Sequence, residues 1–180
     1  KTKTAMGSRK LKSWLMNPLR DKEQINRRYD KIEKLNKEFI EKDELRDLLY
    51  EIYDLERLCA KVICGSLNGR DLLQIKNSLS VLPRIKDIIE DLGFSYTINT
   101  HDDLYNLLEC SIYENPPIST KEGFLIKDGY NEELDELKSI RSGGKDFIAE
   151  FESHIKETTG IKNLKVGFNR VFGYYIEVSK

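Results

Sequence analysis

The stretch LKVGFNRVFGYYIEVSK, residues 164–180, has a different pattern from the rest of the chain. Over residues 164–168 and 174–178 apolar side chains alternate with other residues, and this period of two is typical of β-strands. The connector begins with Asn169 and ends with Gly173, two residue types that tolerate positive φ. The pattern predicts a β-hairpin. Because two strands alone are marginally stable in water, we expect something outside the chain to complete the sheet.

Before the hairpin, apolar residues recur every three or four positions, which predicts a mainly α fold. Gly65 is expected to end one helix, Pro83 to interrupt another, and residues 93–99 to form a loop. Residues 124–129 are expected to be a strand or turn. The expected helices span residues 5–16, 22–39 after a cap at Asp21, 43–64, 71–82, 84–92, 101–112 after a cap at Thr100, and 131–158.

The last of these helices is the longest, since 28 residues at 1.5 Å each extend about 42 Å. Its apolar residues from Leu134 to Ile155 keep a heptad-like interval, which predicts a seam against another helix. Gly143 and Gly144 each weaken a helix by roughly 1 kcal/mol, so a bend is expected there. We therefore expect a helical core over residues 1–128, a long protruding helix over 129–160, and the hairpin over 161–180.

Charge is distributed unevenly although the net charge is only −1. Residues 1–34 hold eleven Lys and Arg against four Asp and Glu, and residues 160–180 hold four against one. These basic ends fit either nucleic-acid contact or ordinary solvated helix faces. Neither a transmembrane run nor a signal segment is found, so no membrane partner and a cytoplasmic, reducing compartment are expected.

The three cysteines do not have the spacing of a metal site, and they are odd in number. Cys59 and Cys110 lie among leucines at helical intervals. This pattern favours reduced core thiols over metal ligands. The chain also begins at Lys1 without an initiator Met, as an excised fragment would.

The sequence contains no motif for catalysis. The string GSLNGRD, residues 65–71, lacks the lysine and the spacing of a phosphate-binding loop. His101 and His154 are isolated, and His154 is expected to be a surface residue. Nothing brings together a nucleophile, a base and an oxyanion donor. We expect a non-catalytic chain with no cofactor and no metal of its own.

Several ordered motifs resemble the MutS family of DNA mismatch-repair proteins. The strings LKVGFN (164–169) and VFGYYI (171–176) resemble the signature of that family's clamp, and TAMGSR (4–9) with WL (14–15) and PL (18–19) resembles the opening of its core, or lever, domain. Further strings follow in the family's order: DLER (54–57), NGRDL (68–72), LP (82–83), GYNEELDEL (129–137) and TG (159–160).

The resemblance implies a multi-helix lever followed by part of a clamp that holds duplex DNA through its backbone. Asn169 matches the family's DNA-contacting asparagine, and Lys165 and Arg170 are added for their charge and position. The alternative for Asn169 is a turn residue with left-handed φ. The tyrosine pair Tyr174 and Tyr175, together with Val166, Phe168 and Ile176, is expected to pack within the sheet rather than to contact bases.

For the parent protein, the resemblance implies an ATPase that uses ATP and Mg²⁺ in a domain absent here. It also implies mismatched double-stranded DNA, a second MutS-like subunit and a MutL-type protein as partners, in the bacterial cytosol. Two alternatives stay open: a recombination-type relative that does not read mismatches, and a helical scaffold for protein–protein interaction. An enzyme domain is disfavoured by the empty set of catalytic motifs.

Overall fold

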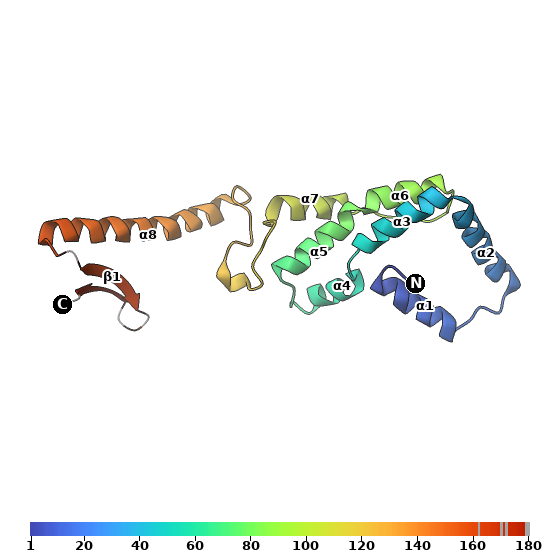
Figure 1. The fold of residues 1–180 in the computed structure, drawn as a ribbon, viewed down its shortest axis with the longest axis horizontal. Helices are drawn as coiled ribbons and strands as arrows, with labels where there is room; N and C mark the ends of the chain where they lie inside the picture. Colours follow the sequence, from blue (N-terminus) through green and yellow to red (C-terminus); the bar gives the residue numbers. More distant parts are fainter. Residues whose placement is uncertain (162, 170, 172, 179–180) are drawn as a thin grey trace. The chain divides into compact units, whose positions relative to one another are not determined.

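The computed structural model describes the backbone of residues 1–161, 163–169, 171 and 173–178, and their side chains except those of residues 140–147. The described chain is mainly helical and ends in a two-stranded antiparallel sheet, which confirms the predicted fold class (Figure 1). It forms two compact units, Lys1–Lys127 and Asp128–Lys180, each of which is considered by itself.

The first unit consists of seven α-helices and one short 3₁₀-helix within its described residues. They are α1 (Ala5–Met16), α2 (Lys22–Lys37), α3 (Phe39–Glu51), α4 (Leu55–Ile63), α5 (Gly69–Ser80), α6 (Leu82–Asp91), α7 (Asp102–Ser111) and η1 (Thr120–Glu122). Helix α5 packs beside α7, and α3 lies against both α2 and α6 (Figure 1).

The buried core of this unit belongs to its second half. No residue of α1, α2 or α3 is buried. The buried apolar residues come from α4 to α7 and the segments that join them: Leu58, Leu79, Val81, Ile85, Ile88, Leu92, Leu108 and Ile112. The hydrophobic stabilisation of this unit is therefore concentrated after residue 54.

The single helix expected over residues 43–64 is wrong, because the chain breaks between α3 and α4. Asp54 becomes the N-cap of α4, and its side chain accepts a hydrogen bond from the Arg57 N–H. The Tyr53 N–H, freed by the break, donates to the hydroxyl of Ser78 at 3.0 Å. Ser78 is fully buried and donates in turn to the Gln74 carbonyl. The backbone N–H that the break leaves without a helical partner is thus hydrogen-bonded by a side chain of α5.

Several other helix bounds differ from their predictions. Helix α2 ends at Lys37, and Phe39, which was expected to end it, begins α3 in place of residue 43. Helix α5 begins at Gly69 rather than residue 71, because Asn68 and Asp71 form a reciprocal capping box. Helix α7 begins after His101, and Thr100 is not its cap. His101 has φ of 52° and its N–H donates to Asn99 Oδ1. The end predicted at Gly65, with φ of 63°, is confirmed. The interruption predicted at Pro83 falls earlier, because α5 ends at Ser80 and Pro83 lies in the first turn of α6.

The cysteines are not core residues as expected. Cys59 and Cys110 are free and exposed, as is Cys64. Their neighbours Leu58 and Leu108 are the buried residues of those turns. The leucine spacing identified the right helices, but it placed the thiols on the wrong faces.

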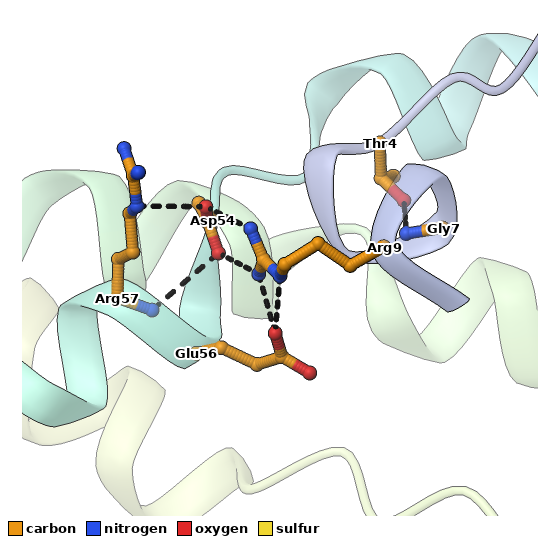
Figure 2. Close-up of polar contacts among 6 residues, drawn as sticks. All are labelled: Thr4, Gly7, Arg9, Asp54, Glu56 and Arg57. Atoms are coloured by element: carbon orange, nitrogen blue, oxygen red, sulfur yellow. Dashed lines mark hydrogen bonds and ion pairs between the residues drawn. The ribbon is translucent and has the colours of Figure 1, made fainter. Parts of the chain in front are cut away.

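Helix α1 is held to α4 by charged groups. Arg9 reaches both oxygens of Asp54, with Nη1 2.8 Å from Oδ2 and Nη2 2.6 Å from Oδ1. Its Nε lies 2.8 Å from Glu56 Oε2, and its Nη2 also contacts Glu56 (Figure 2). Helix α1 is also linked to α2, because the Arg28 guanidinium of α2 lies 3.8 Å from the centre of the Trp14 ring of α1. Polar and cation–π contacts take the place of burial here.

The first unit ends in a short extended segment that returns to α7. Ile126 forms an antiparallel bridge with Ile112, and the Lys127 N–H donates to the Ser111 carbonyl. The Lys127 ammonium also donates to the Glu109 carbonyl. The strand or turn expected for residues 124–129 is confirmed as this bridge.

The second unit consists of α8 (Glu132–Thr159) and the hairpin strands β1 (Leu164–Asn169) and β2 (Gly173–Val178). Asn131 caps α8 by accepting from the Leu134 N–H, and Gly160 ends it with φ of 69°. The helix continues through Gly143 and Gly144, and a bend there stays a prediction. His154 is exposed, as expected. Leu137 and Phe151 on the predicted seam are exposed as well.

Candidate nucleic-acid interface

The hairpin pairs its strands in a register that gives it two different faces. Residues directly opposite each other in an antiparallel pair place their side chains on the same side of the sheet. One face carries three apolar pairs, Leu164 with Val178, Val166 with Ile176, and Phe168 with Tyr174. The other face, which we call the polar face, carries Lys165 with Glu177, Gly167 with Tyr175, and Asn169 with Gly173.

Among the described residues, the apolar face is buried at the start of β1 and exposed farther along the strands. Leu164 is 3% exposed, Val166 is half-buried, and β1 is the strand that contacts α8. Farther along, Phe168 and Tyr174 form a cross-strand ring pair with centroids 5.0 Å apart, yet both are exposed. The expected packing of Phe168 and Tyr174 within the sheet is thus confirmed, although neither ring is buried; Ile176 is exposed as well.

At the centre of the polar face, the ring of Tyr175 lies over Gly167. A Cβ placed on Gly167 would lie 2.7 Å from Cζ and 2.8 Å from the hydroxyl oxygen of Tyr175. The tyrosine ring therefore covers the glycine across the strand pair, an arrangement that compensates for the missing side chain. The expected packing of Tyr175 within the sheet is thereby confirmed, but Gly167 was not identified from the sequence as the residue that it covers. The signal was present as a glycine and an aromatic residue at facing positions.

Two of the three predicted DNA-contacting residues lie on this polar face. Lys165 and Asn169 are both exposed and are separated by four residues along β1, so they share a side of the strand. Arg170 lies outside the described residues. The structure thus brings Lys165 and Asn169 to one face, with Gly167 between them.

Asn169 has a defined role within the turn. Its Oδ1 accepts a hydrogen bond from the Val171 N–H at 2.8 Å, which makes an Asx turn. The alternative interpretation, a turn residue with left-handed φ, is right about the turn and wrong about the conformation, because Asn169 is not among the residues with positive φ, whereas Gly173 has φ of 75°. The bond uses the acceptor of the amide. Within the described chain no group accepts from the Asn169 Nδ2, which remains a donor toward solvent.

Glu152 of α8 lies against the outer edge of the hairpin. Its Oε2 accepts from the Val166 N–H at 2.9 Å, and its Oε1 lies 2.5 Å from the ammonium of Lys156. The hydrogen bond from Lys156 lowers the pKa of Glu152, and the Val166 N–H and the charge of Lys165 act in the same direction. Glu152 is therefore an anion at neutral pH. No sequence pattern predicts this contact.

Among the residues that the structure describes, His, Cys, Asp and Glu side chains nowhere gather in threes as a metal site would require. Of the helices described, none combines the length and the apolar character needed to cross a bilayer.

Comparison with known proteins identifies the family. The family model of MutS domain III matches residues 1–164. The chain belongs to the MutS family. It is 51% identical over 185 residues to the DNA mismatch repair protein MutS of Geobacillus sp. (strain WCH70), covering 99% of this chain and 22% of that protein. It is 50% identical to the MutS of Bacillus subtilis (strain 168), with the same coverage, and 48% identical to that of Ruminiclostridium cellulolyticum, over 100% of this chain and 21% of that protein.

The chain thus spans about a fifth of the length of the MutS relatives that it matches. The match to MutS domain III ends at residue 164, where β1 begins. The alignments to the MutS relatives include nearly the whole chain, and so they extend into the hairpin. The resemblance predicted from sequence motifs is confirmed.

Proposed function

We propose that this chain is the lever and the first part of the clamp of a DNA mismatch-repair protein, and that its hairpin contacts the backbone of duplex DNA. The relatives that match it over nearly its whole length are named DNA mismatch repair proteins. The observation that carries the proposal is the placement of Lys165 and Asn169 on one exposed, polar face of the hairpin.

The chemistry of this face suits phosphate oxygens. Lys165 offers a cation, and Asn169 offers its Nδ2 as a donor because its Oδ1 is occupied by the turn. Backbone contacts of this type give affinity and orientation without reading sequence. Between Lys165 and Asn169, the space over Gly167 is taken up by the Tyr175 ring, so Tyr175 is the surface that DNA would meet there. Arg170, next in sequence after Asn169, would add a further cation.

The remaining roles in the proposal concern the whole protein. The lever would connect an ATPase domain, which binds ATP and Mg²⁺, to the clamp. A stiff helix such as α8 transmits displacement, whereas an irregular segment would absorb it. The partners would be mismatched double-stranded DNA, a second MutS-like subunit and a MutL-type protein, in the cytoplasm. This chain would carry no catalytic residue.

The test is the joint substitution Asn169→Ala and Arg170→Ala in the full-length protein. We expect weaker binding to matched and mismatched duplexes alike. The slope of log affinity against log salt should also fall by about one for the lost cation. Lys121→Ala is the matched control, because it removes one exposed cation on η1, outside the hairpin. Unchanged affinity of the double variant at matched salt would remove the hairpin turn from the interface.

A further inference from the structure

The outer edge of β1 is closed by a side chain rather than by another strand. In an antiparallel pair, every second residue directs its N–H away from the partner strand. Val166 is such a residue, because its N–H donates to Glu152 of α8 at 2.9 Å. A carboxylate that accepts a backbone N–H forms a charge-assisted bond, stronger than a bond between neutral groups. Glu152 therefore satisfies an edge donor that would otherwise face solvent.

Glu152 is itself held in place on α8. Lys156, one turn further along the helix, lies 2.5 Å from its Oε1. The Glu152 side chain is 26% exposed and that of Lys156 is 35% exposed, so the pair is partly shielded from water and from salt. One carboxylate oxygen is directed to the helix and the other to the strand. The ion pair thus fixes the rotamer that reaches Val166.

Two contacts hold β1 at neighbouring residues: the hydrogen bond from the Val166 N–H to Glu152, and the burial of the Leu164 side chain. Leu164 is 3% exposed at the start of the strand, and the Val166 N–H is bound two residues later. Two such points determine both where the strand lies on α8 and how it is rotated about its own axis. The rotation decides which way the polar face, with Lys165 and Asn169, is directed.

We propose that Glu152 is a positioning residue, which orients the polar face of the hairpin toward DNA by binding the Val166 N–H. This inference rests on the proposed function of that face. Glu152 would not touch DNA itself. The charge of Glu152 also acts on Lys165, which makes a competing prediction possible. If Glu152 acted only as a nearby anion, removing it would strengthen DNA binding.

Three substitutions in the full-length protein separate these two effects. Glu152→Ala removes the acceptor and the charge, whereas Glu152→Gln removes the charge but keeps an oxygen that can accept from Val166. Glu150→Ala is the matched control, since it removes an exposed carboxylate from the same turn of α8. Affinity for a duplex is measured by fluorescence anisotropy at one fixed salt concentration, and far-UV circular dichroism verifies that each variant is folded.

We expect Glu152→Ala to bind DNA about fivefold more weakly, as the loss of one hydrogen bond would give. Glu152→Gln should weaken binding by about twofold, less than Glu152→Ala, because its one oxygen can still accept from the Val166 N–H although the ion pair with Lys156 is lost. Glu150→Ala should bind as well as the unsubstituted protein or slightly more tightly. Hydrogen exchange of the Val166 amide should be faster in Glu152→Ala than in Glu152→Gln. Equal or tighter binding by Glu152→Ala would overturn the inference, and so would equal weakening by the Ala and Gln variants.

The outcome is distinguishable from failure of the proposed function. If the Asn169→Ala and Arg170→Ala protein loses affinity while Glu152→Ala does not, the hairpin contacts DNA and Glu152 does not position it. If the Asn169 and Arg170 variant keeps full affinity, the DNA contact itself is wrong, and the positioning role toward DNA is overturned with it.

Discussion

Arg9 of α1 and Asp54, the N-cap of α4, are 45 residues apart in sequence and form a two-pronged ion pair, with distances of 2.8 and 2.6 Å between nitrogen and oxygen. The planar guanidinium matches both carboxylate oxygens at once, which a lysine ammonium does not do. The hydrogen bond from Arg9 lowers the pKa of Asp54. The first helix is thereby tied to a helix from the other half of the unit.

The first prediction concerns this tie. Arg9→Lys and Arg9→Met should each raise hydrogen exchange of the α1 amides, because no residue of α1 is buried and little else holds the helix. The rise should be about threefold, the scale of an exposed ion pair. Hydrogen-exchange mass spectrometry measures it. Lys12→Met is the control, since Lys12 is an exposed cation on the same helix. An equal rise in exchange in that variant would show that the ion pair between Arg9 and Asp54 does not stabilise α1.

The second prediction concerns the buried carboxylate of Asp71, which is 5% exposed. Burial by itself would raise the pKa of Asp71, but the hydrogen bonds from the Lys61 ammonium at 2.7 Å and the Asn68 N–H at 3.1 Å outweigh it and lower the pKa. A group whose pKa is lower in the folded state stabilises the fold above its ordinary pKa, near 3.8, and loses that contribution as pH falls through the folded value.

Asp71→Asn should therefore lower the free energy of unfolding by about 1–3 kcal/mol at pH 7. The difference from the unsubstituted chain should stay constant above about pH 5 and shrink below about pH 4. Urea unfolding followed from pH 7 to pH 3 measures both curves. Glu114→Gln, an exposed carboxylate outside the core, should show no such convergence. A difference for Asp71→Asn that does not change with pH would contradict the account.

The third prediction concerns Gly69, the first residue of α5. An added Cβ would lie 2.5 Å from Leu125 Cδ1 and 2.7 Å from Pro116 Cβ, so Gly69→Ala should cost about 1–3 kcal/mol through overpacking. Gly65→Ala gives a comparison, because space there is open but φ is 63°. Urea unfolding should show that Leu125→Ala relieves part of the cost at Gly69 and none at Gly65. Additive effects of Gly69→Ala and Leu125→Ala would rule out a clash with Leu125 as a cause of the cost.

The fourth prediction concerns catalysis. The purified 180-residue chain should hydrolyse no ATP above a buffer blank, because its sequence holds no phosphate-binding loop. A coupled assay for ADP release, with and without duplex DNA, measures this. Steady turnover that co-purifies with the chain through two different columns would contradict the non-catalytic interpretation.

Much of the fold could be predicted because local patterns determined it. The change from a helical period to a period of two located the hairpin, and Gly160 marked the end of α8. The break between α3 and α4 could not be found in this way. The group that satisfies the Tyr53 N–H is the hydroxyl of Ser78, 25 residues away, and Asp54 alone is a weak signal for a cap within a continuous apolar stripe.

In the candidate site too, local patterns predicted some features, whereas others depend on tertiary contacts. The positions of Lys165 and Asn169 on one face followed from strand alternation, which needs no tertiary information. The contact between Glu152 and Val166 depends on where β1 lies on α8, which Gly160 alone does not determine. The exposure of Cys59 and Cys110 was also unpredictable, because leucine spacing locates a buried stripe but not its width.

The absence of buried residues from α1, α2 and α3 has a consequence for how the first unit comes apart. Opening these helices takes no buried residue of their own out of the core, although it uncovers the side of α6 against which α3 packs, whereas opening α4 to α7 exposes the whole core. Mild denaturant or a protease should therefore release roughly the first fifty residues as a separate cooperative step, while the remainder of the unit stays folded.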